Sequence, residues 1–236
     1  YDKKSETASP GYYAVFFPDS GVRTELTATE RTGFYRFTFP QTERGRVLMD
    51  LGANENSIEV VNDHTVRGRS GRGGRCFVAE FSQPFKTFGT FRQNPPRLDG
   101  GRVRRSDFVE PEGRSISGSY AGAYLEFSTP AGEQILVRIA SARNFDAAQK
   151  QLDADGSDFD AVHQHARELW SEKLNLIQVE GGTEHERNLF YSTLYNSLLT
   201  PRLIYKKGTP LHGRDEGKVA DYDRYSPIAF WDTGRN

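Results

Sequence analysis

The stretch Phe34-Tyr35-Arg36-Phe37-Thr38-Phe39 sets the first expectation for the fold, because its aromatic and polar side chains can alternate between two faces. Alternation with a period of two is the signature of a β-strand that has one face directed to a core. Gly33 precedes the stretch and Pro40 follows it, and both residues commonly bound strands. The segment therefore predicts a strand whose aromatic face is buried.

Similar short runs, rich in aromatic and β-branched residues and separated by Gly, Pro and Asp, fill the first 142 residues. They lie at 12–17, 23–27, 34–39, 46–51, 57–61, 66–69, 75–81, 86–91, 115–127 and 133–140. About ten strands without a helical period between them predict a mainly β protein with a β-sandwich, and not a βαβ fold. The segment 94–113 contains Pro95-Pro96 and Gly100-Gly101, and we expect it to form a long surface loop.

The hydrophobic period becomes helical at Arg143. Asn144 can cap a short helix over 145–152, and Ser157 or Asp158 can begin a second helix that ends at 178–182. Apolar residues of this second helix fall on one stripe at three- and four-residue spacing, namely Val162, Ala166, Leu169, Trp170, Leu174 and Ile177.

A third helix is predicted by a capping box of Thr183 and Glu186. Its expected apolar face comprises Phe190, Leu194, Ser197 and Leu198, Pro201 closes it, and a short strand is expected at 202–205. One amphipathic helix with a long polar loop behind it cannot close a helical domain. We therefore divide the chain into a sandwich (1–142), a helical connector (143–181) and the beginning of a larger helical domain (182–236), and expect the protein to continue.

Composition excludes several classes of function. The net charge of −1 gives no global attraction to nucleic acid or to an anionic membrane. No run of eighteen apolar residues is present, and the first residues are not a signal peptide. The single cysteine, Cys76, lies in an apolar strand pattern, so we expect a buried structural thiol and not a nucleophile.

Four motifs together resemble one enzyme family. They are the helix motif Phe190–Pro201 (FYSTLYNSLLTP), the later Trp231-Asp232-Thr233, the segment from Pro10-Gly11-Tyr12-Tyr13 to Gly33, and the segment from Phe77 to Phe85. This combination is similar to glycoside hydrolase family 92, the calcium-dependent exo-acting α-mannosidases of bacteria and fungi. The resemblance covers nearly the whole chain.

The resemblance implies a sandwich of the galactose-mutarotase-like (supersandwich) type, followed by connector helices and the first part of an (α/α)6 barrel. It implies release of terminal α-linked mannose from mannans or N-glycans by an inverting mechanism in the periplasm or outside the cell. The general acid, the general base and the calcium ligands of the family would lie later in the barrel, so we assign none of them to this chain. We expect this portion alone to be inactive, and the family's sandwich normally begins before Pro10.

Trp231 and Asp232 form the main candidate site. An indole can lie against the apolar face of a pyranose, and a carboxylate can accept two hydroxyl hydrogen bonds. On chemistry alone, a core tryptophan beside a helix-capping aspartate explains the same pair. The resemblance implies that Asp232 binds the hydroxyls of the terminal mannose, and that Gly73 and Gly74 lie in a loop near the substrate. The family's usual Gly-Trp-Ala-like sequence is absent from that loop, which leaves an aromatic contact there in doubt.

Other patterns favour simpler interpretations. The segment from Asp153 to Asp160 has its glycine at the fourth position and no glutamate at the twelfth, so we expect helix caps and a solvated turn instead of a calcium loop. The arginine–glycine run from Arg67 to Arg75 resembles an RNA-binding segment, but a glycine-rich hairpin connection fits better. Two rivals to hydrolysis remain: a non-catalytic carbohydrate-binding sandwich and a nucleic-acid module.

Overall fold

The computed structural model describes most of the chain. The described residues are 3–71, 74–93, 97–99, 102–104, 107–200, 203–209 and 217–226, and the side chains at 97–99, 102–104 and 107 are not described. The chain divides into two compact units, Tyr1–Leu169 and Trp170–Asn236, and each is considered separately. No helix in the described ranges has the length and apolar character needed to cross a membrane.

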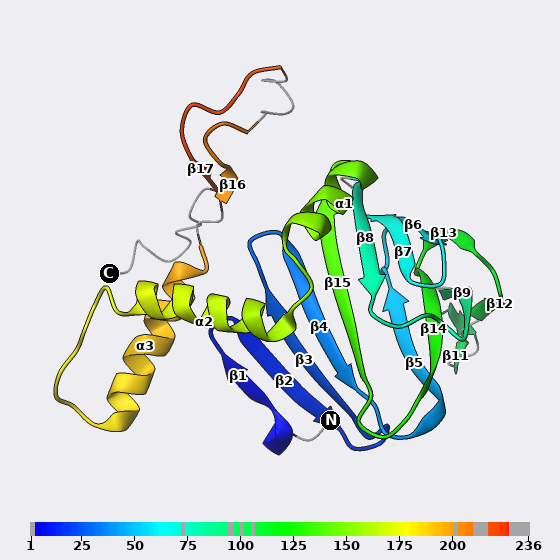
Figure 1. The fold of residues 1–236 in the computed structure, drawn as a ribbon, viewed down its shortest axis with the longest axis horizontal. Helices are drawn as coiled ribbons and strands as arrows, with labels where there is room; N and C mark the ends of the chain where they lie inside the picture. Colours follow the sequence, from blue (N-terminus) through cyan, green and yellow to red (C-terminus); the bar gives the residue numbers. More distant parts are fainter. Residues whose placement is uncertain are drawn as a thin grey trace. The chain divides into compact units, whose positions relative to one another are not determined.

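The first unit is a β-sandwich built on a nine-stranded antiparallel sheet (Figure 1). After a short 3-10 helix, Lys3–Ser5, this sheet has the strand order β1-β2-β3-β4-β15-β8-β7-β6-β13. Its strands are β1 (Thr7–Ser9), β2 (Tyr12–Phe17), β3 (Val22–Ala28), β4 (Thr32–Thr38), β6 (Glu55–Val60), β7 (Thr65–Ser70), β8 (Arg75–Phe81), β13 (Ser115–Ser119) and β15 (Gln134–Ala142).

A four-stranded antiparallel sheet packs against the inner face of the large one. Its order is β12-β9-β14-β5, with β5 (Thr42–Asp50), β9 (Thr87–Gln93), β12 (Asp107–Pro111) and β14 (Ala121–Thr129). Strand alternation places apolar side chains of both sheets in one core, among them Ile58, Phe81, Leu125, Phe127 and Val137. The predicted β-sandwich is thereby confirmed.

Both faces of the strand β4 are covered. Tyr35 and Phe37 pack on the inner core, whereas Phe34, which is 2% exposed, does not belong to that core. Arg36 is two residues after Phe34, so its side chain lies on the same side of the strand. The alternation predicted from this stretch is therefore present, with an apolar residue buried on each side.

Two strand predictions were wrong. The segment 94–113 is not a plain loop, since β10 (Arg97–Asp99) pairs with β11 (Arg102–Arg104), and β12 adds to the edge of the small sheet beside β9. The predicted strand 115–127 is two strands in different sheets. Gly118 near the end of β13 (φ 124°) and Tyr120 between the strands (φ 57°) have positive φ, which breaks the regular extended backbone.

The helix α1 (Phe145–Ala154) covers the outer face of the large sheet. Asn144 caps it as predicted, because the Ala147 N–H donates to its Oδ1 at 2.8 Å. Ala148 and Leu152 are fully buried and pack on Val78 and Ala140 of the strands beneath. The alanines at 140 and 148 allow the helix to lie close to the sheet.

Arg138 of β15 joins this helix to the sheet. Its Nη2 forms an ion pair with Glu80 Oε2 at 2.5 Å, and its Nη1 donates to the Leu152 carbonyl at 2.8 Å and to the Gly156 carbonyl. One guanidinium thus binds a carboxylate of the neighbouring strand and the carbonyls at the C-terminal end of α1, which intrahelical bonds leave unpaired.

The helix α2 (Phe159–Leu174) begins with contacts to the same outer face. Phe159 is 2% exposed and lies under the Arg36 guanidinium, which also pairs with Asp160 Oδ1 at 2.9 Å. Tyr12 stacks on His163 with ring centroids 4.2 Å apart. The helix is shorter than predicted and ends before Ile177, and its expected stripe is only partly buried, since Leu169 is exposed.

The second unit contains α3 (Glu184–Leu198) and a two-stranded sheet of β16 (Leu203–Tyr205) and β17 (Arg224–Tyr225). The capping box of Thr183 and Glu186 is present as predicted. No residue of α3 is buried, and Leu198 and Leu199 are exposed. Trp170 contacts Tyr195 with ring centroids 4.7 Å apart. The apolar face predicted for α3 is therefore only partly covered within the described part of the chain.

Replacing Leu125 tests the shared core of the two sheets. Leu125 is fully buried, so Leu125→Ala should lower the free energy of unfolding of the sandwich by about 2–5 kcal/mol. Leu48→Ala is the matched control, because Leu48 is 62% exposed and its loss should change stability by less than about 0.5 kcal/mol. Urea unfolding measures both variants, and equal effects would contradict the core described above.

The buried Glu25–Arg36 pair should make stability pH-dependent. Two guanidinium nitrogens of Arg36 donate to Glu25 at 2.9 Å each, and this bonding holds the pKa of Glu25 below its ordinary value. The stabilisation is therefore complete at neutral pH and is lost as the pH falls from about 5 towards 3.

Glu25→Gln should be less stable than the parent by about 1.5–3 kcal/mol at pH 7, and this difference should shrink in acid. Glu30→Gln, at an exposed glutamate, serves as the control. Unfolding free energies between pH 7 and pH 3 test this, and a difference that grows in acid would be the opposite of the expectation.

Candidate functional site

Of the four predicted site residues, only Gly74 belongs to the described residues. Trp231, Asp232 and Gly73 lie outside them, so their roles stay predictions. Gly74 lies in the connection between β7 and β8, at the end of the sandwich where β15 also passes into α1 (Figure 1). The candidate site is therefore built from this hairpin end and the sheet surface beside it.

Gly74 closes the hairpin turn. Its N–H donates to the Gly71 carbonyl at 3.0 Å, just outside the last strand pair, Ser70 with Arg75. Its φ of 57° is in the left-handed region, where a Cβ is unfavourable. A Cβ added at Gly74 would meet no atom within 4 Å, so the glycine serves the backbone conformation and not close packing. The prediction of a glycine-rich hairpin connection is confirmed at this end.

Asn56 of β6 fixes this hairpin to a neighbouring turn. Its side chain is buried, its Nδ2 donates to the carbonyls of Leu51, Gly52 and Asn54 at 3.1, 3.0 and 2.6 Å, and its Oδ1 accepts the Gly71 N–H at 3.2 Å. One amide thus satisfies backbone groups of two loops. This role was not predictable from the sequence, because Gly71 is brought to Asn56 only by folding.

Further bonds hold the other connections at this end. The Tyr120 N–H donates to the Gly52 carbonyl at 2.7 Å, and Arg75 Nη2 donates to the Ser141 carbonyl at 3.3 Å. Cys76 is fully buried, with its thiol 3.5 Å from the Arg143 carbonyl. The prediction of a structural thiol is confirmed. Four loops thus form a fixed surface, on which the hairpin with Gly74 is held in one place.

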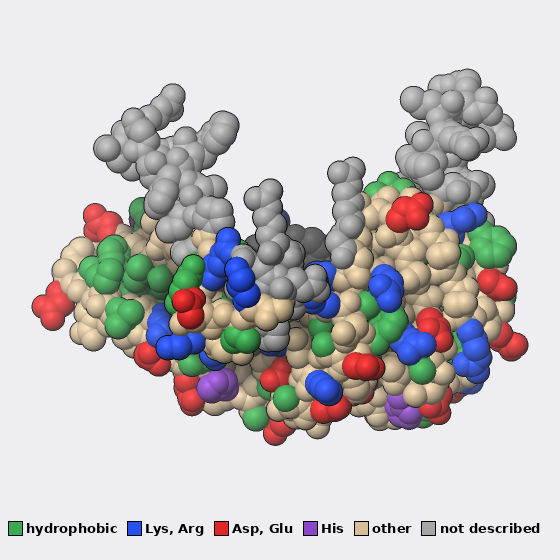
Figure 2. All heavy atoms as spheres, turned by 90° about the horizontal axis from the view of Figure 1, so that it is seen from above, with side chains coloured by type: hydrophobic (Ala, Val, Ile, Leu, Met, Phe, Trp, Pro, Cys, Tyr) green, Lys and Arg blue, Asp and Glu red, His purple; other side chains and the backbone are tan. Residues whose placement is uncertain are grey.

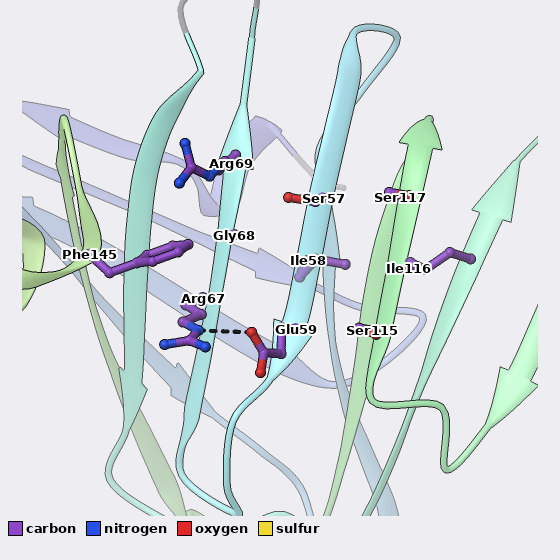
Figure 3. Close-up of a pocket in the computed structure, with 10 residues that line it drawn as sticks. All are labelled: Ser57, Ile58, Glu59, Arg67, Gly68, Arg69, Ser115, Ile116, Ser117 and Phe145. Carbon is purple, nitrogen blue, oxygen red and sulfur yellow. Dashed lines mark hydrogen bonds and ion pairs between the residues drawn. The ribbon is translucent and has the colours of Figure 1, made fainter.

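A groove of ≈ 550 Å³ runs beside the hairpin on the outer face of β7, β6 and β13 (Figure 3). Its lining residues are Ser57, Ile58, Glu59, Arg67, Gly68, Arg69, Ser115, Ile116, Ser117 and Phe145. Arg67 Nε lies 2.8 Å from Glu59 Oε2. The ring of Phe145 lies between Arg67 and Arg69, with guanidinium carbons 4.9 and 5.5 Å from its centroid. The groove is polar, with one aromatic side chain at its edge.

The acidic segment after α1 acts as turn and cap, as predicted. Asp155 accepts a hydrogen bond from Thr29 Oγ1 at 2.8 Å, and Asp158 accepts the N–H groups of residues 160 and 161 at 3.0 and 3.1 Å. Asp160 pairs with Arg36. Each carboxylate has a separate protein partner. Within the described ranges, no three His, Cys, Asp or Glu side chains gather as a metal site would need.

Two arginines of the hairpin strands have structural partners. Arg67 pairs with Glu59, and Arg75 binds a backbone carbonyl. On the face that Figure 2 shows, basic and acidic side chains of the described residues are interspersed. A nucleic-acid surface would instead gather basic side chains into a stripe or patch. This arrangement favours the hairpin interpretation over the RNA-binding one.

Comparisons with known proteins agree along the length of the chain. Residues 1–141 match the glycosyl hydrolase family 92 N-terminal domain, and residues 146–236 match the glycosyl hydrolase family 92 catalytic domain. A curated relative from the fungus Arthroderma benhamiae, named as an uncharacterized secreted glycosidase, is 26% identical over 230 residues. That match covers 86% of this chain and 29% of the relative.

Solved structures give the same result. A family 92 inverting mannosidase from Bacteroides thetaiotaomicron has a TM-score of 0.83 at 28% identity, over 99% of this chain and 32% of its own. A second α-mannosidase of that bacterium, solved with mannoimidazole, has a TM-score of 0.79 at 26% identity, over 99% and 32%. The chain thus spans about a third of the length of these relatives. The chain belongs to glycosyl hydrolase family 92.

Proposed function

We propose that the intact protein is an exo-acting α-mannosidase that releases terminal α-linked mannose from mannans or N-glycans. The observation that carries this proposal is the match of both family 92 domains to nearly the whole chain. The likeness at 26–28% identity to two bacterial mannosidases, one solved with mannoimidazole, supports mannose as the sugar. The fungal relative is named as secreted, which supports our proposal of a periplasmic or extracellular location.

The proposed reaction inverts the anomeric centre. One carboxylic acid protonates the leaving oxygen while a carboxylate opposite it activates a water, with the two groups about 6.5–9.5 Å apart. The likeness to a protein named as an inverting mannosidase supports this choice. We place both groups outside residues 1–236. We also retain the proposed division of the chain into sandwich (1–142), connector (143–181) and the beginning of the (α/α)6 barrel (182–236).

Calcium is part of the same proposal. Bound calcium would hold the mannose in a distorted ring through oxygen coordination. Among the described residues, no three His, Cys, Asp or Glu side chains form such a ligand set. We therefore place the calcium ligands elsewhere in the polypeptide, and no role of the residues described here depends on them.

Within this chain, we propose that Asp232 and Trp231 bind the substrate and that the hairpin of Gly73 and Gly74 lies near the sugar. An ionised Asp232 would accept hydrogen bonds from two mannose hydroxyls, and Trp231 would shape the pocket. The conformation of Gly74 supports a role for the hairpin in binding. Gly74 has a left-handed φ, and Asn56 anchors the turn through the Gly71 N–H. A backbone without side chains allows a ligand to approach closely.

The test uses the intact protein and an α-linked mannobiose. Asp232→Asn should lower kcat/KM for mannose release by about 10- to 150-fold, the loss expected when charged hydrogen bonds become neutral. Asp19→Asn, at an exposed turn aspartate, should leave the rate unchanged. A chelator should abolish activity and added calcium should restore it.

Three results would count against the proposal in different ways. Absence of mannose release from every α-linked mannoside would refute the activity. Release that resists chelation would refute the calcium requirement. Mannoside binding without hydrolysis, unaffected by Asp232→Asn, would favour the alternative of a non-catalytic carbohydrate-binding sandwich.

A further inference from the structure

Part of the outer face of the nine-stranded sheet has no helix over it in the described structure. The helix α1 packs over β15 and β8, and the first half of α2 contacts residues of β2 and β4. The outer face of β7, β6 and β13 forms the groove instead, and only Phe145 of α1 lines it. This surface has polar side chains on every one of its three strands.

The strand register arranges those side chains in two rows that cross the strands. Arg69 is opposite Ser57, and Ser57 is opposite Ser117, so these three form the first row. In the second row, Arg67 is opposite Glu59, and Glu59 is opposite Ser115. Residues opposite one another on adjacent strands point to the same face, as Figure 3 shows for both rows.

The two rows differ in charge. Arg67 of the second row is neutralised by Glu59 at 2.8 Å. The first row has a cation and two hydroxyls but no carboxylate, and Arg69 has no ion-pair partner among the described residues. A guanidinium with neighbouring hydroxyl donors is suited to a carboxylate, which accepts two parallel hydrogen bonds from arginine.

Phe145 determines which kind of ligand fits. Both faces of its ring are occupied by guanidinium groups, those of Arg67 and Arg69 (Figure 3). A neutral sugar that binds by stacking on an aromatic ring therefore finds no free face on Phe145. The same contact restrains the exposed Arg69 side chain and lowers the entropy lost when it binds an anion.

The first row is longer than a single anionic group. Its ends are two strand spacings apart, about 9–10 Å. An anion held by Arg69 and Ser57 leaves Ser117 free to bond a more distant hydroxyl of the same ligand. We propose that this groove binds an acidic saccharide, with a uronate carboxylate at Arg69 and Ser57 and ring hydroxyls at Ser117 and Ser115.

This proposal rests on residues other than Trp231, Asp232, Gly73 and Gly74, and its test does not depend on hydrolysis. Binding is therefore measured in the intact Asp232→Asn protein by calorimetry, with glucuronate, glucose and inorganic phosphate as separate probes. Glucose differs from glucuronate in having CH₂OH in place of the carboxylate. We expect glucuronate to bind at least about tenfold more tightly than glucose, a difference of about 1.4 kcal/mol.

Variants assign that binding to the groove. Arg69→Gln should weaken glucuronate binding at least about tenfold, and Ser57→Ala with Ser117→Ala should weaken it further. Arg31→Gln, which removes an exposed arginine in the β3–β4 turn, should have no effect. Thermal unfolding shows whether each variant is folded, and Arg69→Lys provides a second folded variant that keeps the charge but loses the paired donors.

Three outcomes would overturn the inference. The first is equal binding of glucose and glucuronate. The second is binding of phosphate as tight as that of glucuronate, which would show a general anion site without saccharide recognition. The third is glucuronate binding that Arg69→Gln leaves unchanged. None of these results bears on mannose release, so failure here is distinguishable from failure of the mannosidase proposal.

Discussion

The ion pair and carbonyl contacts of Arg138 are the interaction on which the rest of the sandwich's outer layer depends. Its guanidinium binds Glu80 on the adjacent strand and the carbonyl groups of residues 152 and 156 at the end of α1. A short helix has little stability alone, so tertiary contacts must hold it. With α1 in place, the chain is directed into α2, whose first turn is held by Arg36. Two partly buried arginines thus set the path from strands to helices.

Local sequence determined most of the strands and caps but not their long-range partners. The strands β2 and β8 have the bounds that their composition predicted, and Asn144 and Thr183 cap helices as expected. The strand β12 was missed because its pairing with β9 depends on a distant partner, whereas nearby proline and glycine pairs suggest a loop. Ala166 and Leu169 belong to the same predicted helical stripe, yet folding buries Ala166 and leaves Leu169 exposed.

For the candidate site, too, local features could be predicted from the sequence and long-range partners could not. Motifs identified the family and the hairpin, because glycine in a left-handed turn and the Trp-Asp-Thr sequence are local signals. Asn56 could not be identified, because its bond to the Gly71 N–H joins two loops that become neighbours only in the folded chain. The row of Arg69, Ser57 and Ser117 depends on strand register across three strands, which no single segment specifies.

We propose that Asp232, Trp231 and the Gly73–Gly74 hairpin each contact mannose in the intact protein. The most direct measurement is a crystal structure of that protein with mannoimidazole, the ligand solved with a related α-mannosidase. We expect the ligand to lie within hydrogen-bonding distance of the Asp232 carboxylate, about 2.5–3.0 Å, and to contact the hairpin backbone. A ligand bound away from both segments would contradict it.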